Sequence, residues 1–360
     1  MTGLLAAFFV SFFVTIIIIR SQKWHLHFSA DSDLSGPQKF HLTAVPRIGG
    51  LAIFCGICVA ILMRYQSSDQ ASQEVILLMC ALPVFLIGII EDITKKISIR
   101  LRLVFTAIGA LMAVLFLNVQ ITHLDIPIVD VALSLSFVAI IFTVFAITGL
   151  ANAYNIIDGF NGLSSMVGMI TLMAIAYVSY LVNDPLITYL SFSMVAAILG
   201  FFLWNYPKGL IFLGDGGAYF MGFWIAVLSI LIVARHENVS PWFALLINAY
   251  PIWETLFTMY RRKFHQGKSP GHPDGIHFHS LIFRRILNHS AIKYESQWFC
   301  ANAKTSPYLW VLSSMAVIPA VKFWDSTPIL MGAFILFAIT YVWIYKRIVC
   351  FQTPSWMHIK

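Results

Sequence analysis

Long apolar runs alternate with short polar segments along the whole chain. Eleven such runs are centred on residues 2–19, 48–63, 75–90, 103–117, 131–149, 163–182, 187–204, 218–234, 242–258, 308–324 and 328–345. A helix needs roughly 20 predominantly apolar residues to cross the hydrocarbon core of a bilayer. The pattern therefore predicts an all-α, polytopic transmembrane bundle of about eleven helices, with residues 1–360 forming a single domain.

Composition supports this prediction. Hydrophobic residues make up 59% of the chain and charged residues only 11%, with a mean hydropathy of +0.82. These values lie outside the range of soluble globular proteins. The first run has no basic residues before it and no convincing small-residue cleavage site after it, so we expect a membrane span there and not a secretory signal peptide.

The basic residues are distributed unevenly between the two sides that alternating loops define. Of the 23 lysines and arginines, only Arg64, Arg235 and Lys322 fall on one side. Cytoplasmic loops of membrane proteins are enriched in lysine and arginine. The distribution predicts a periplasmic amino terminus and a cytoplasmic carboxyl terminus, and it explains the formal charge of +7 without a nucleic-acid partner.

One long segment, about 259–306, separates the ninth and tenth runs and is predicted to be cytoplasmic. It is expected to contribute to ligand binding through its histidines. Within it, residues 276–288 combine five large apolar side chains with Arg284 and Arg285. Such an amphipathic stretch is typical of a helix that lies in the membrane interface.

Two polar segments on the predicted cytoplasmic side carry charges that could act on phosphate. Lys39 and Arg47 precede two glycines at the start of the second run, where they could bind phosphate or simply anchor the helix. Glu91 and Asp92 end the third run and are followed by basic residues that include Arg102. Two acids at a helix carboxyl end are unfavourable unless a cation or a proton offsets them, which favours a functional site.

Two further segments carry ligands suited to a metal ion. Asn152, Asn155 and Asp158 recur every three residues, so on a helix they would share one face. Their oxygen atoms are of the kind that Mg²⁺ binds together with substrate phosphates. Asp215 lies in a Gly-Asp-Gly-Gly sequence at a membrane entry, where an ionisable group is a functional candidate.

A fifth segment contains His277 and His279. The spacing could suggest zinc, but no cysteine or third histidine stands close by to complete a zinc site. Donation of hydrogen bonds to phosphate is the preferred interpretation.

Taken together and in this order, the segments resemble the polyprenyl-phosphate N-acetylhexosamine-1-phosphate transferase family, glycosyltransferase family 4. The family pattern is an acidic pair followed by basic residues, then NxxNxxDGxDG, GDxG and PDRxHxHH; the corresponding residues here are 91–92, 152–162, 214–217 and 273–280. Three departures occur. Glu91 stands where aspartate is usual, Asn161 replaces the second acid of DGxDG, and Gly275 and Ser280 replace the arginine and the final histidine.

The resemblance implies an enzyme of the bacterial inner membrane with a cytoplasmic site that depends on Mg²⁺, with Mn²⁺ as an alternative ion. It would transfer a sugar-1-phosphate from a UDP-sugar to undecaprenyl phosphate and release UMP, as the initiating step of a surface polysaccharide such as O-antigen. The expected donor is UDP-GlcNAc, with UDP-FucNAc and UDP-QuiNAc as alternatives. Membrane lipid is a further expected partner, and a homodimer is left open.

The resemblance also implies the site residues. The catalytic candidates are the carboxylates Asp92, Glu91, Asp158 and Asp215. The metal candidates are Asp215 and Asn155. The substrate-binding candidates are Lys39, Arg47, Arg102, Asn152, Asn155, His277 and His279.

Each group has an implied role. Asp92 would deprotonate or position the lipid phosphate, while Glu91 and Asp158 would shape the surrounding field. Lys39, Arg47 and Arg102 would bind the lipid phosphate or the diphosphate. His277 and His279 would hold the phosphates of the nucleotide-sugar.

Three alternative functions fit the sequence less well. A phospho-muramyl-pentapeptide transferase would carry a triple-histidine run and TDG and GDTG sequences, which this chain lacks. An intramembrane prenyltransferase needs two aspartate-rich clusters, and residues 155–158 are not one. A lipid or solute transporter would place charged or broken helices at mid-membrane, whereas the polar motifs here gather on one predicted face.

Overall fold

The structure, a computed structural model, describes residues 1–24, 45–65, 70–265, 276–287 and 295–352. This part of the chain is all-helical, as predicted. The helices are α1 (Thr2–Arg20), α3 (Gly50–Arg64), α4 (Ala71–Thr94), α5 (Ile99–Leu117), α6 (Pro127–Leu133), α7 (Ser136–Ile156), α8 (Leu163–Leu181), α9 (Pro185–Asn205), α10 (Gly214–Arg235), α11 (Pro241–Ile247), α12 (Ala249–His265), α13 (Phe278–Ile282), the π-helix η1 (Phe283–Leu287), α14 (Glu295–Lys322) and α15 (Thr327–Val349).

Nine of the eleven predicted runs each coincide with one helix, while 131–149 spans the end of α6 and most of α7, and 242–258 spans the pair α11 and α12. Within the described ranges, eight helices are long and apolar enough to cross a membrane: α1, α4, α5, α7, α8, α9, α10 and α15. The chain is therefore a multi-pass membrane protein. The sides on which its two termini lie remain a prediction.

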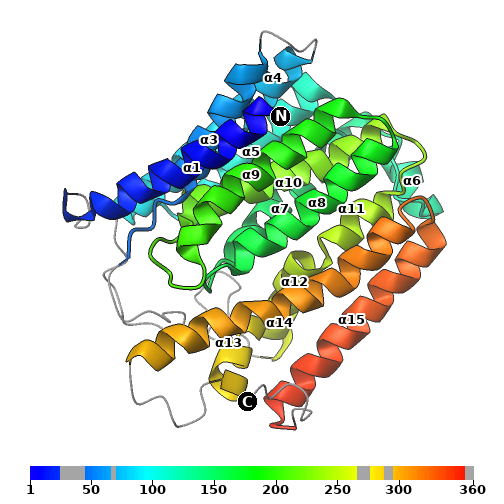
Figure 1. Cartoon of the computed structure of the whole chain (residues 1–360). Helices are drawn as coiled ribbons and strands as arrows, with labels where there is room; N and C mark the ends of the chain where they lie inside the picture. Colours follow the sequence, from blue (N-terminus) through cyan, green and yellow to red (C-terminus); the bar gives the residue numbers. More distant parts are fainter. Residues whose placement is uncertain (25–44, 66–69, 266–275, 288–294, 353–360) are drawn as a thin grey trace.

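Helix α10 forms the core of the bundle (Figure 1). Every residue from Gly214 to Ile232 is buried, and α3, α4, α7, α8 and α9 pack around this helix. A helix that is apolar on all sides is covered either by lipid or by protein, and here it is protein that encloses the helix. The two ends of α10 are therefore held in place by most of the fold.

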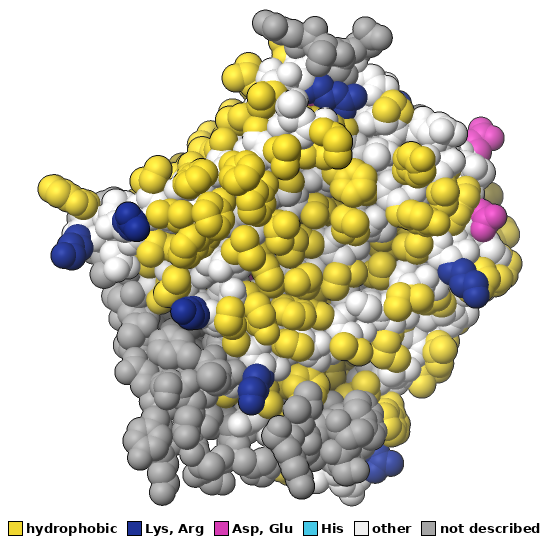
Figure 2. Space-filling model, in the orientation of Figure 1, with side chains coloured by type: hydrophobic (Ala, Val, Ile, Leu, Met, Phe, Trp, Pro, Cys, Tyr) yellow, Lys and Arg dark blue, Asp and Glu magenta, His cyan; other side chains and the backbone are white. Residues whose placement is uncertain are grey.

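Helix α1 shows how the outer helices meet lipid. Its small side chains Gly3, Ala7, Ser11 and Thr15 are buried, and they let the helix pack closely against α3 and α9. Its large side chains point outward: Leu5, Phe9, Phe13 and Ile17 are all about half exposed or more. Figure 2 shows a face of the molecule covered almost throughout by such apolar side chains, with the charged ones near its rim.

The ninth predicted run is broken into two helices at Asn248, which is fully buried. Its side-chain oxygen accepts a hydrogen bond from the Tyr154 hydroxyl, and its nitrogen donates to Ser229 Oγ and to the carbonyl oxygen of Ala244. A break within a membrane protein is tolerated where other protein groups satisfy the freed polar atoms. The run therefore bends inside the bundle, a feature that apolar periodicity does not reveal.

The structure corrects the prediction that residues 276–288 lie in the membrane interface. Phe278, Leu281, Ile282 and Phe283 are at most 3% exposed, in α13 and η1, which pack against α14. The apolar face of the segment is covered by protein and not by lipid. Much of the predicted 259–306 loop is also helical, since α12 extends to His265 and α14 begins at Glu295.

Candidate active site

Glycines bring the ends of three helices into backbone contact. A Cβ atom on Gly88 of α4 would lie 2.5 Å from the Cα atom of Gly216 in α10, and one on Gly217 would lie 2.8 Å from the Cα atom of Gly50 in α3. No real side chain fits at such separations. The absence of side chains therefore lets α3 and α4 touch the first turn of α10, where Asp215 lies.

Asp92 of α4 holds that first turn. Its two carboxylate oxygens accept hydrogen bonds from the backbone N–H groups of Asp215 and Gly216, at 2.8 and 2.9 Å. The first N–H groups of a helix have no partner within the helix, and a carboxylate is favourable at this positive end of the helix dipole. Gly214 has φ of +75°, and a Cβ atom there would lie 2.6 Å from Asp92 Oδ2, so this approach requires glycine.

The segment before α3 is tied to the segment before α10, and this places Arg47. The N–H group of Phe212 donates to the carbonyl oxygen of Pro46 at 2.8 Å, and the N–H group of Gly49 donates to that of Phe212 at 2.9 Å. As a result, Arg47 Nη2 lies 3.2 Å from Asp215 Oδ1. The backbone hydrogen bonds between these two segments, which are distant in the sequence, therefore place the Arg47 guanidinium beside Asp215.

Asp215 is the centre of the polar cluster. Besides Arg47, it contacts the Arg102 guanidinium of α5 through Oδ2 and accepts a hydrogen bond from Asn155 Nδ2 of α7 at 3.1 Å. Arg47 Nη2 also lies 3.7 Å from Asp92 Oδ1. Four predicted segments therefore converge on Asp215, although they are spread over 168 positions of the chain.

Asn152 lies at the edge of this cluster, one helical turn before Asn155. Its side-chain oxygen accepts a hydrogen bond from the Tyr219 hydroxyl at 2.7 Å, and the Arg102 guanidinium carbon lies 5.6 Å from the centre of the Tyr219 ring. Tyr219 thus connects two predicted site residues. It belonged to no polar motif and was missed from the sequence.

Asp158 lies just beyond the end of α7 and not on it, so only Asn152 and Asn155 share the predicted helical face. The side chain is partly buried in the turn that follows the helix. Desolvation there raises the pKa of Asp158 to about 7, against the opposing attraction of the Arg47 guanidinium. The carboxyl group therefore changes its charge near neutral pH.

His277 and His279 lie against the same turn. Their rings stack with centroids 5.2 Å apart, and the His279 ring meets the edge of Phe160 at 5.4 Å. A Cβ atom on Gly159 would lie 3.1 Å from His279 Nε2, closer than most real Cβ contacts, so the histidine ring lies directly against this glycine. The histidine segment is therefore packed on the residues that follow Asp158.

Two predicted residues are not part of the cluster as described. Glu91 turns toward the loop after α4, where Glu91 Oε2 accepts a hydrogen bond from the N–H group of Ile97 at 2.6 Å. Lys39 lies outside the described residues. Asn161, the departure from DGxDG, is 2% exposed; its backbone N–H group donates to Asn302 and its side-chain nitrogen donates to the carbonyl oxygen of Pro207.

The oxygen ligands at Asp215 fit a magnesium ion that also binds the substrate. Within the described ranges, no group of three His, Cys, Asp or Glu side chains could hold a metal by itself. Magnesium, however, is commonly bound through one or two carboxylates, with waters and substrate phosphates completing its six ligands. Asp215 supplies a carboxylate, and the amide of Asn155, turned by 180°, would supply a second oxygen beside it.

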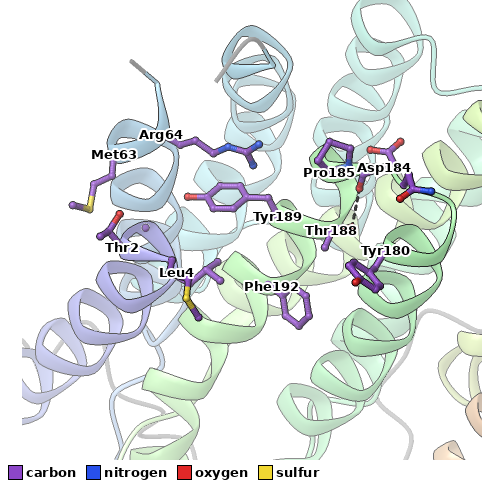
Figure 3. A pocket seen from close by; sticks show the side chains of 13 residues that line it. Thr2, Leu4, Met63, Arg64, Tyr180, Asp184, Pro185, Thr188, Tyr189 and Phe192 are labelled. Carbon is purple, nitrogen blue, oxygen red and sulfur yellow. Dashed lines mark hydrogen bonds between the residues drawn. The ribbon is translucent and has the colours of Figure 1, made fainter. Parts of the chain in front are cut away.

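A second polar cluster lies at the opposite end of α10. Asp184 Oδ2 accepts from Arg235 Nε at 2.8 Å and lies 3.0 Å from His236 Nε2, while Oδ1 accepts from the N–H groups of Leu186 and Ile187. The carboxylate is one wall of a pocket of about 680 Å³, and Figure 3 shows Arg64 on the side facing α1. These contacts hold the Asp184 carboxylate between the start of α9 and the end of α10.

Comparison with known proteins matches residues 74–233 to the model of glycosyl transferase family 4. This region belongs to glycosyl transferase family 4. The matched family 4 region contains Asp92, Asn155 and Asp215, three of the groups that meet at the start of α10. The resemblance predicted from the motifs is confirmed, and with it membership of a phosphoglycosyltransferase family.

Similar proteins extend the relationship beyond the family 4 region. A probable undecaprenyl-phosphate N-acetylglucosaminyl 1-phosphate transferase of Bacillus subtilis is 28% identical over 80% of this chain and 80% of its own length. An undecaprenyl-phosphate alpha-N-acetylglucosaminyl 1-phosphate transferase of Haemophilus influenzae is 29% identical over 94% of both chains. One of Salmonella typhi is 27% identical over 79% of this chain and 77% of its own.

Proposed function

We propose that this protein transfers a sugar-1-phosphate from a UDP-sugar to undecaprenyl phosphate. An oxygen of the lipid phosphate attacks the sugar-proximal phosphorus of the donor. The bond from that phosphorus to the bridging oxygen breaks, UMP leaves, and a polyprenyl-diphospho-sugar remains in the membrane. We propose N-acetylglucosamine as the sugar, because the names of the similar proteins specify it, and initiation of a surface polysaccharide such as O-antigen as the role.

One observation carries the proposal: Asp215 lies at one end of the bundle in direct contact with two guanidinium groups, those of Arg47 and Arg102. The reaction must bring two anionic phosphates together, so it depends on charge neutralisation and positioning. Guanidinium groups bind phosphate oxygens well. In the proposed reaction, the two arginines exchange their contacts with Asp215 for contacts with substrate phosphates.

The residues of the site have different roles in the proposed reaction. Asp215 and Asn155 would hold Mg²⁺, which when bound neutralises phosphate charge and polarises the phosphorus–oxygen bonds. Asp92 was predicted either to deprotonate or to position the lipid phosphate. We assign it a positioning role, because it is fully buried and both of its oxygens accept backbone hydrogen bonds from the turn that carries Asp215.

We further propose that the site faces the cytoplasm. Its flanking segments carry most of the basic residues, including Lys95, Lys96 and Arg100 directly after α4, whereas the opposite end has few. A cytoplasmic site would also meet nucleotide-sugars where cells make them. Thiol labelling in intact cells tests this: a cysteine at Lys96 should react only with permeant reagents, and one at His123 also with impermeant ones.

The direct test is UMP release by the purified full-length protein from UDP-GlcNAc and undecaprenyl phosphate, with and without Mg²⁺. Parallel reactions with UDP-FucNAc, UDP-QuiNAc and UDP-MurNAc-pentapeptide identify the donor. Asp215→Asn should abolish release, while the matched variant Asp184→Asn, at the far end of α10, should remain active. Release that needs Mg²⁺ and Asp215 supports the proposal; silence with all four donors in the folded protein would refute it.

A further inference from the structure

A carboxylate outside every predicted motif lies behind the two histidines. Glu254 of α12 is 1% exposed, and its oxygens are fully engaged. Oε1 accepts from His277 Nδ1 and from the N–H group of Phe278, each at 3.1 Å. Oε2 accepts from the Tyr341 hydroxyl of α15 at 2.6 Å. Three separate parts of the chain therefore meet on one buried side chain.

These contacts fix the state of the His277 ring. An ionised carboxylate only accepts hydrogen bonds, so the proton must be on Nδ1 of His277, and Nε2 is the nitrogen left for other partners. The Thr258 hydroxyl lies 3.3 Å from the same Nδ1 and adds a polar neighbour on the α12 side. Glu254 thus fixes the proton on Nδ1 of His277. A hydrogen bond from Nε2 to a phosphate oxygen requires a second ring proton, and the Glu254 carboxylate lies 3.1 Å away as the counter-ion of that cation.

The other ionisable groups that face this carboxylate are few. His279 lies beside it on α13, Tyr250 on its own helix and Tyr341 on α15. The Tyr341 hydroxyl donates its hydrogen bond to Glu254. Glu254 is therefore a negative charge that both His277 and His279 face.

The position of the histidines is passed on to the active-site turn. His277 stacks on His279, and the His279 ring contacts Phe160 and lies against Gly159. These residues directly follow Asp158. A shift of Glu254 would therefore move the histidine segment relative to the turn at the active site.

We propose that Glu254 is a positioning residue that orients His277 and serves as its counter-ion for contact with the phosphates of the nucleotide-sugar. This inference rests on the proposed function, because it assigns the histidine pair to the donor. Glu254 itself is enclosed by protein and touches no substrate. Its effect passes through the ring of His277, as an acid that orients a histidine acts in other enzymes.

The test is Glu254→Gln, which keeps the size of the side chain and removes its charge. We expect the KM for the UDP-sugar to rise by about 10- to 100-fold, as for other residues that orient a ligand-binding histidine, with an unchanged KM for undecaprenyl phosphate. The alkaline limb of the pH profile should move to lower pH, because the imidazolium loses its counter-ion. Glu254→Asp keeps the charge and should recover part of the donor affinity.

Tyr341→Phe is the matched control. It removes a hydrogen bond from the same carboxylate but leaves the charge and the His277 contact, so it should lower the thermal unfolding midpoint and leave the KM for the UDP-sugar within about threefold. Equal losses for both substrates in Glu254→Gln, or an unmoved pH profile, would reduce Glu254 to a packing role and overturn the inference.

A second measurement keeps the inference separate from the reaction. Histidine-ring ¹⁵N spectra of the purified protein, with His277→Gln used to assign the signal, should show a proton on Nδ1 and a His277 signal that changes in Glu254→Asp or Glu254→Gln. A His277 signal that does not respond overturns the positioning role whether or not UMP is released. A parent protein that releases no UMP while this signal responds refutes the proposed function alone.

Discussion

The two ends of α10 both carry charged clusters, yet they use an aspartate differently. At the far end, the Asp184 oxygens are occupied by two backbone N–H groups of α9 and by Arg235 and His236. At the near end, the partners of Asp215 are side chains, two guanidiniums and an amide. Side chains can turn away to meet a ligand, whereas backbone groups in a helix cannot.

At the far end, Asp184 alone both caps a helix and contacts an arginine. At the near end, two aspartates share these contacts. Asp92 holds the backbone N–H groups at the start of α10, as Asp184 does at the start of α9. Asp215 therefore does not cap the helix, and its side-chain partners could be exchanged for a ligand. The comparison shows that the two buried carboxylates differ in their bonding partners more than in burial or charge.

The largest effect should come from Asp215→Asn. Loss of this charge removes the proposed metal ligand and leaves Arg47 and Arg102 without their anion, so turnover should fall by about 10³-fold. UMP release measures it, and the thermal unfolding midpoint of the variant should stay close to that of the parent. Retention of a tenth of the activity would contradict the assignment.

Asp92→Asn should have the next largest effect. An amide offers one acceptor oxygen, so one of the N–H groups of Asp215 and Gly216 loses its partner, at a cost of about 1–3 kcal/mol in the free energy of unfolding. We expect turnover to fall by about 10²-fold through misplacement of Asp215. If stability is unchanged while activity disappears, Asp92 acts on the substrate directly and the division of tasks is wrong.

The pH profile tests Asp158 with a smaller effect. Because its pKa is raised to about 7, the group is ionised above that pH and mostly neutral one unit below it. If its negative charge serves the site, turnover should fall by about tenfold from pH 8 to pH 6. The decline should be absent in Asp158→Asn; a parent profile that is flat over this range would exclude such a role.

The smallest effect on turnover should come from Asp184→Ala at the far end. The change removes a helix cap and an ion pair whose arginine is one-third exposed, which together should lower the free energy of unfolding by about 2 kcal/mol. UMP release should stay within about threefold of the parent. A large loss of activity in a folded variant would show that the two ends of α10 are coupled.

The apolar runs were sufficient to predict the helices, because lipid imposes a length and a composition on every span. They could not predict the break at Asn248, which depends on partners from α7 and α10. They also misplaced residues 276–288, since an amphipathic helix can lie on lipid or pack on protein, and periodicity is the same for both. Boundaries were offset too: α4 begins at Ala71, where the run began at 75.

Motifs singled out the polar residues expected at the site, and the structure brings Arg47, Arg102, Asn155 and Asp215 together as one cluster. Their pairwise contacts depend on the glycines that let helices touch, which no motif specifies. Glu254 was missed because it stands alone in an apolar run. A signal existed nonetheless: an ionisable residue inside a predicted span is costly there and marks a candidate site by itself.

The burial of α10 also isolates the reaction from the thickness of the bilayer. Membranes that are thicker or thinner than a hydrophobic span make helices tilt or stretch the lipid around them. From Gly214 to Ile232 this helix has no exposed residue through which lipid could act, whereas the large apolar side chains of α1 face outward. Changes in membrane composition should therefore be absorbed by the outer helices, and the spacing of the charged groups at the start of α10 should remain constant as growth conditions vary.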